Sequence, residues 1–103
     1  MSLPEVEHDA ARRHLEARIE AFIAGHEASG QPPDAFAGEY LVRALASLKA
    51  GDFAAGEARL RLAETPPNRR SPEDIARVPR GYALLSTVEH RRSFEKIKTG
   101  KLR

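Results

Sequence analysis

Apolar side chains recur every three to four residues along most of this chain, in segments bounded by proline and glycine. That spacing places them on one face of an α-helix, whereas a strand needs an apolar-polar alternation that this sequence lacks. Val and Ile are few, and the abundant Ala, Leu, Arg and Glu favour helix. The sequence therefore predicts an all-α fold, a small array of four to five helices built on a central antiparallel helix hairpin. Because the chain has 103 residues, we expect one domain over residues 1–103.

The first helix is expected over residues 4–29, because Gly30 and the prolines that follow end it. One stripe of this helix carries its larger apolar side chains. The members of that stripe are Ala11, Leu15, Ile19, Phe22 and Ile23. An alanine stripe lies nearly opposite and would let a second helix approach closely, which predicts a homodimer. The members of the alanine stripe are Ala10, Ala17, Ala21 and Ala24.

Residues 34–64 are expected to form the helix hairpin. Asp34 is placed to cap the first of its helices, which we expect to reach Ala50. Gly51 alone separates that helix from a second one that opens at Asp52. Because the connection is so short, the two helices must be antiparallel neighbours.

Residues 65–71 are expected to be a loop, because consecutive prolines end the preceding helix. Ser71 then caps a further helix. C-terminal helical segments are expected over residues 72–98, followed by a basic tail over residues 99–103. We expect the last helix to start near Tyr82, but residues 82–88 also fit an extended chain.

Residues 37–70 resemble one tetratricopeptide repeat, a helix-turn-helix unit. The matching residues are Tyr40, Ala44, Gly51-Asp52-Phe53, Leu60, Ala63 and Pro67-Asn68. The sequence departs from the family's pattern at Arg43, Ser47 and Gly56. The resemblance implies a helical scaffold that binds peptides or proteins and does no chemistry. The partner-binding groove is then expected beside Tyr40, Arg43, Ser47 and Arg59.

Charge is divided unevenly along the chain. Residues 1–68 hold 7 Lys and Arg against 11 Asp and Glu, whereas residues 69–103 hold 10 against 4. The basic region could bind the phosphates of a nucleic acid, as in a phage or mobile-element protein, or it could meet the acidic half of the chain. The candidate phosphate contacts are Arg91, Arg92, Lys96, Lys98 and Lys101. His90, Phe94 and Ile97 share one face, as expected of a helix docked on the core.

No group of residues in the sequence is arranged for catalysis. The chain has no Cys, and it contains neither a serine nucleophile elbow nor a glycine-rich phosphate loop. His8 and His26 share one face of the first helix, but their separation of roughly 27 Å is too great for a common metal ion. We expect both to be partly buried structural histidines. The sequence thus predicts a non-enzymatic interaction or adaptor protein with no cofactor and no metal.

Apolar runs in the sequence all fall short of the roughly 18 residues that span a membrane. The N-terminus also lacks the basic and apolar regions of a signal peptide. We therefore expect a cytoplasmic protein without membrane contact, and the abundance of Ala and Arg indicates a bacterial source.

Overall fold

The structure is a computed structural model that describes residues 5–79 and 84–100. The described residues form α1 (Glu5–Ser29), α2 (Ala35–Ala50), α3 (Phe53–Ala63), α4 (Pro72–Ala76) and α5 (Thr87–Thr99), with a 3-10 turn over Pro67–Arg69. These ranges contain no strand, so the all-α prediction is confirmed. The first residue of the predicted first helix and residues 101–103 of the predicted basic tail lie outside the described residues.

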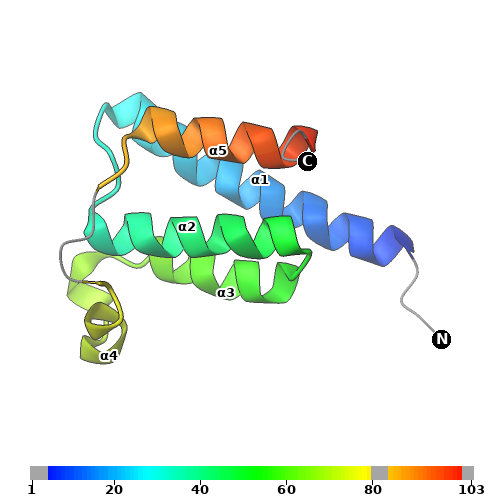
Figure 1. Cartoon of the computed structure of the whole chain (residues 1–103). Coiled ribbons are helices and arrows are strands. Elements are labelled where there is room, and N and C mark those ends of the chain that lie inside the picture. The colour runs from blue at the N-terminus through cyan, green and yellow to red at the C-terminus, as the bar shows by residue number, and fades with distance from the viewer. Residues whose placement is uncertain (1–4, 80–83, 101–103) are drawn as a thin grey trace.

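The hairpin of α2 and α3 is present as the sequence predicts. Asp34 accepts a hydrogen bond from the Ala37 backbone N–H at 2.8 Å and so caps α2. Gly51 ends α2 with a φ of 82°, a left-handed conformation that glycine adopts without strain. Asp52 then caps α3 by accepting a hydrogen bond from the Ala55 N–H at 3.2 Å. The two helices lie antiparallel and side by side (Figure 1).

α1 packs across this hairpin, and α5 packs on both α1 and α2 (Figure 1). The stripe of larger apolar residues on α1 faces inward from Leu15 onward, where Leu15, Ile19 and Ile23 are fully buried. Its first member, Ala11, is exposed. The three buried residues enter a core made with Phe36, Tyr40, Leu41, Ala44, Leu45, Leu48, Phe53, Leu60, Ala63 and Phe94. Burying one Leu or Ile side chain contributes roughly 1.5–3 kcal/mol. This stripe therefore joins the hairpin to α5.

Gly56 lets α1 approach α3 closely. A Cβ atom at this position would lie 2.4 Å from Cδ2 of Leu15 and 3.5 Å from Cβ of Ser47. Because Leu15 is fully buried, its side chain has little room to move aside. The missing side chain at Gly56 thus sets how deeply Leu15 inserts between the helices of the hairpin.

α5 begins at Thr87, so the prediction that the last helix starts near Tyr82 is wrong for the described residues 84–86. A capping box marks the start of the helix: Ser86 Oγ accepts a hydrogen bond from the Glu89 N–H at 3.2 Å, and Glu89 accepts one from the Ser86 N–H at 2.8 Å. Ser86 itself has extended backbone angles, in line with the alternative of an extended segment. Residues 82 and 83 lie outside the described residues.

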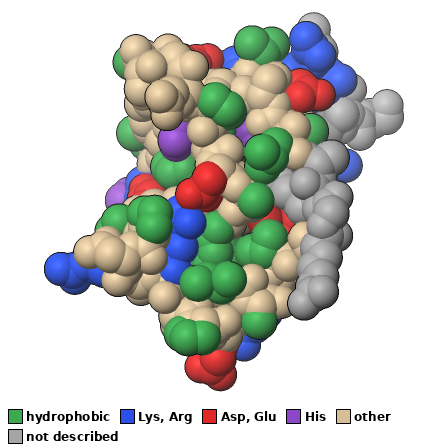
Figure 2. All heavy atoms as spheres, turned by 90° about the vertical axis from the view of Figure 1, so that its left-hand side faces the viewer, with side chains coloured by type: hydrophobic (Ala, Val, Ile, Leu, Met, Phe, Trp, Pro, Cys, Tyr) green, Lys and Arg blue, Asp and Glu red, His purple; other side chains and the backbone are tan. Residues whose placement is uncertain are grey.

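α4 is a short helix at one end of the molecule (Figure 1). Ser71 caps it by accepting a hydrogen bond from the Asp74 N–H at 3.1 Å, as the sequence predicts. Figure 2 views this end, where apolar side chains gather on the surface. Among the described residues, the exposed large apolar side chains are Ile75, Leu84 and Val88. They belong to α4, to the segment before α5 and to the first turn of α5.

We predict that Gly56→Ala lowers the free energy of unfolding by about 1 kcal/mol. Alanine favours helix over glycine by about 1 kcal/mol, but overpacking against Leu15 costs about 1–3 kcal/mol. Gly25→Ala is the matched control, because nothing lies within 4 Å of a Cβ atom built there, and it should raise stability by about 0.5–1 kcal/mol. Urea denaturation measures both changes. An equal gain in the two variants would contradict the close approach at Gly56.

Candidate functional site

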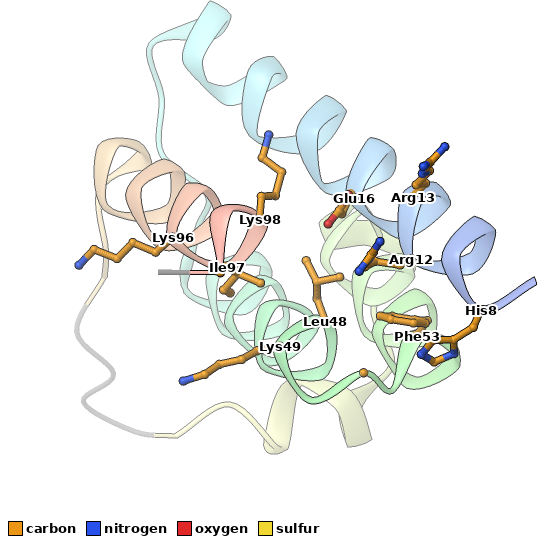
Figure 3. A pocket seen from close by; sticks show the side chains of 12 residues that line it. His8, Arg12, Arg13, Glu16, Leu48, Lys49, Phe53, Lys96, Ile97 and Lys98 are labelled. Atoms are coloured by element: carbon orange, nitrogen blue, oxygen red, sulfur yellow. The ribbon is translucent and has the colours of Figure 1, made fainter. Parts of the chain in front are cut away.

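A cleft opens where three segments distant in sequence meet: the first half of α1, the turn between α2 and α3, and the last turn of α5 (Figure 3). Its volume is about 670 Å³. We call it the basic cleft, because its lining contains five Lys and Arg side chains and a histidine against a single acid, Glu16. A cavity of this size lies within the range of ligand sites, about 300–1,000 Å³.

The floor of the basic cleft is apolar. It includes Leu48 from the end of α2, Phe53 from the start of α3 and Ile97 from α5. Leu48 and Phe53 are buried core residues, and Ile97 packs against the same core. The floor is therefore held rigidly by the packing that defines the fold.

The rim of the basic cleft is cationic. Its basic side chains are His8, Arg12, Arg13, Lys49, Lys96 and Lys98. Lys49 and Lys96 are exposed and have no ion-pair partner among the described residues. Both lie in the last turn of a helix, where the helix dipole balances part of their charge. Figure 3 shows their side chains at the edge of the cleft and pointing outward.

The remaining Lys and Arg side chains of the rim are paired to neighbouring acids. Arg12 and Arg13 both contact Asp9, which lies three and four residues before them in α1. Lys98 lies 3.3 Å from Glu95, and its ammonium is 4.6 Å from the centre of the Phe94 ring. Exposed pairs of this kind are worth only about 0–1 kcal/mol. An anionic ligand can therefore compete for these cations at small cost.

The groove predicted from the tetratricopeptide resemblance is present in part. Arg43, Ser47 and Arg59 line a separate, shallow cavity of about 430 Å³. Tyr40 does not contribute to it, because the residue is only 2% exposed. Its hydroxyl donates a hydrogen bond to the Asp74 carbonyl at 3.2 Å. The prediction that Tyr40 contacts a partner is therefore wrong, since this side chain joins the core to α4.

Arg43 is engaged within the chain. Its Nε donates to the Glu39 carboxylate at 2.6 Å, and its Nη2 donates to the Arg77 carbonyl at 3.1 Å. The guanidinium also lies over the Tyr40 ring, 5.0 Å from its centre. This groove consequently offers fewer unengaged polar groups than the basic cleft.

Arg91 on α5 is clamped by glutamates of α1. Its Nη1 and Nη2 donate to the Glu20 carboxylate at 2.6 and 2.8 Å, and its Nη2 donates to Glu27 at 2.8 Å. These hydrogen bonds lower the pKa of both glutamates and raise the pKa of Arg91. Lys98 adds a contact to Glu20 at 3.9 Å. The acidic and basic parts of the chain thus meet at the α1–α5 interface, which is one of the two alternatives that the charge distribution leaves open.

Within the described residues, the predicted phosphate contacts fall into two groups, those paired with glutamates and those without an ion pair. Arg91 and Lys98 pair with glutamates. Arg92 and Lys96 are exposed, with no ion-pair partner among the described residues. Lys101 lies outside the described residues. Lys96 is therefore available at the rim of the basic cleft, whereas Arg91 is used to hold α5 against α1.

The two histidines of α1 have different surroundings. His26 is half-buried as expected, with its Nδ1 2.8 Å from the Gln31 carbonyl and its ring edge-on to Phe22. His8 is exposed, so the expectation of partial burial is wrong for it. Its ring contacts Phe53 at a centroid distance of 4.8 Å. Within the described ranges, no three His, Asp or Glu side chains are grouped to hold a metal ion.

The alanine stripe of α1 faces away from the core. Ala10, Ala17 and Ala21 are exposed, and Ala24 is half-buried. A homodimer through this stripe stays a prediction.

Comparison of the chain with protein-family models, with curated proteins and with solved structures finds no match. The tetratricopeptide resemblance of residues 37–70 therefore stays a prediction. In the part of the chain that the structure describes, no helix has both the length and the apolar character needed to cross a membrane.

The basic cleft is not predicted from the sequence. Of its cations, only Lys96 and Lys98 are predicted from the sequence, whereas Arg12, Arg13 and Lys49 are not. These residues are far apart in the chain and share no spacing motif, because the cleft forms only where α1 crosses the end of the hairpin. The only local indication of the cleft in the sequence is the adjacent pair Arg12 and Arg13, which lies in the acidic part of the chain, residues 1–68.

We predict that Arg91→Met lowers the free energy of unfolding by about 1 kcal/mol at neutral pH and low salt, since it removes several partly exposed ion pairs and keeps most of the apolar stem. Arg92→Met, which changes an exposed residue of the same helix, should have no measurable effect. Because the clamp lowers the pKa of Glu20 and Glu27, its contribution is present above their ordinary value of 4.5 and is lost as the pH falls through their folded-state values.

Thermal unfolding of both variants at several pH and salt values tests this clamp. The difference between Arg91→Met and the parent chain should shrink in acid and in molar salt. A difference that is independent of both conditions would show that Arg91 acts through packing alone.

Proposed function

We propose that this chain is a non-enzymatic protein–protein interaction module that binds an acidic, amphipathic segment of a partner protein in the basic cleft. The observation that carries the proposal is the combination of an apolar floor with a cationic rim in one cavity. An amphipathic helix presents apolar anchors at i, i+3, i+4 and i+7, with charged residues beside them. Its anchors would contact Ile97 and the small exposed parts of Leu48 and Phe53, and its carboxylates would meet the rim.

Charge complementarity supports an acidic partner. Lys49 and Lys96 project from the rim without ion-pair partners among the described residues, so they attract carboxylates without first losing an internal contact. Rim charges of this kind raise the association rate and make binding sensitive to salt. The half-buried Ile97 supplies apolar contact area that rim charges alone lack, above the nearly buried Leu48 and Phe53.

A nucleic acid fits this surface less well. Phosphate binding needs several cations along one path, but Arg91 is held by close ion pairs to Glu20 and Glu27 of α1. The recessed apolar floor also has no role in contacts to a sugar-phosphate backbone. Nucleic-acid binding is therefore the alternative outcome of the experiment below.

The test is fluorescence anisotropy with a labelled helical peptide that carries Leu at the four anchor positions and Glu elsewhere. Lys49→Glu combined with Lys96→Glu should weaken binding at least about tenfold, because each reversal replaces attraction by repulsion. Arg59→Glu is the matched control. It reverses one charge in the shallow groove and should leave the affinity unchanged.

Two results would contradict the proposal. One is a loss of peptide binding in Arg59→Glu but not in the Lys49→Glu, Lys96→Glu chain, which would place the partner in the shallow groove. The other is tighter binding of a single-stranded oligonucleotide than of the peptide at the same salt concentration, which would favour the nucleic-acid alternative.

A further inference from the structure

A second cavity lies between α2 and α5 and has a different chemistry from the basic cleft. Its volume is about 310 Å³. Its walls are mainly apolar, from Val42, Leu45, Leu85 and Ile97, with His90, Ser93 and the exposed Lys96 as polar members. We call it the histidine cavity. It adjoins the basic cleft, because Lys96 and Ile97 line both spaces.

His90 is the unusual residue of this cavity. It is only 1% exposed, and neither Nδ1 nor Nε2 has a hydrogen-bond partner among the described residues. A buried polar atom without a partner costs about 1–3 kcal/mol, and native proteins contain few such atoms. A side chain with two of them at the wall of a cavity points to a ligand that completes their hydrogen bonding.

The imidazole of His90 is neutral in this environment. Burial lowers its pKa, and His26 lowers it further, while the neighbouring carboxylate of Glu89 acts in the opposite direction. A neutral imidazole offers one N–H donor and one acceptor nitrogen. Its complement is a group that donates and accepts, and a hydroxyl does both.

Packing alone does not account for a histidine at this position. Leu or Phe would fill the same space beside Phe94 and Leu45 without burying two polar nitrogens. The neighbouring Phe94 shows that α5 accepts a fully buried large apolar side chain. The chain therefore carries a stability cost at His90 that a binding role explains.

We propose that the histidine cavity binds a small neutral molecule that is mainly apolar and carries one hydroxyl group, with His90 as its hydrogen-bonding partner. The apolar walls disfavour a ligand whose charge is buried among them, and Lys96, the charged residue of the described lining, is itself exposed to solvent. The small volume, at the lower end of the range for ligand sites, restricts the ligand to about the size of one or two rings.

Phenol is the probe for this proposal, and toluene, which has a similar shape but no hydroxyl, is the matched control ligand. Nitrogen NMR of the imidazole rings follows the titration, since the chain has four His and the shift should fall on His90. Phenol should bind the parent chain about fivefold more tightly than toluene does, which corresponds to one net hydrogen bond.

Two variants separate the hydrogen bond from the cavity. His90→Leu should lower the affinity for phenol about fivefold and leave the affinity for toluene unchanged. Val42→Phe should lower the affinity for both ligands, because the larger side chain fills the cavity. This second variant keeps the test valid if His90→Leu does not fold. Three results would overturn the proposal: phenol binds as weakly as toluene, phenol leaves the His90 resonances unshifted, or phenol binds Val42→Phe with the affinity it has for the parent chain.

This proposal is independent of the proposed peptide site. Lys96 lines both spaces, whereas Lys49 lines the basic cleft but not the histidine cavity. Lys49→Glu alone should therefore weaken binding of the acidic peptide and leave phenol binding unchanged. His90→Leu should have the reverse effect. Each site can therefore fail without the other.

Discussion

The structure depends on the burial of one stripe of α1 between the helix hairpin and α5. Leu15, Ile19 and Ile23 are fully buried, and α1 is in contact with α2, α3 and α5. Leu15 reaches its depth only because Gly56 has no side chain. α5 in turn forms one wall of the basic cleft and one wall of the histidine cavity. Both proposed sites thus follow from a single packing interaction.

Electrostatics sets the orientation of the helices around that apolar interaction. Arg91 fixes α5 to Glu20 and Glu27 of α1, and Arg18 of α1 reaches Glu57 within α3 and Glu64 at its C-terminal end. Partly exposed pairs contribute little stability individually, but their directional hydrogen bonds favour one rotation of each helix over others. Arg70, Arg91 and Lys98 of the basic part pair with acids of the first part of the chain in this way.

The sequence predicts the local structure well, because local structure follows from local chemistry. Asp34, Gly51 and Ser71 cap or end helices as expected, and the stripe of α1 faces the core from Leu15 onward. The start of α5 is missed, although Ser86 and Glu89 carry the capping-box spacing that marks it. Tertiary packing accounts for most other errors. Tyr40 matches a repeat-family position, yet its ring and its hydroxyl are used inside the fold.

The sites are the least predictable part, because they join residues that no sequence window contains. The basic cleft combines α1, the α2–α3 turn and α5, and the histidine cavity combines α2 with α5 and Leu85. The shared face of His90, Phe94 and Ile97 predicts a docked helix, and it is confirmed by the burial of His90 and Phe94. It does not predict that both nitrogens of His90 lack partners, since that depends on what α2 and α1 place around the ring.

Native-state hydrogen exchange of Ile19→Val tests the central role of the α1 stripe most directly. This change removes one methylene from the centre of the stripe and costs about 0.5–1.5 kcal/mol. If α1 holds the hairpin and α5 together, the slowest amides of α5 and of α2 should lose as much protection as those of α1. Faster exchange confined to α1, with α2 and α5 unchanged, would contradict the account.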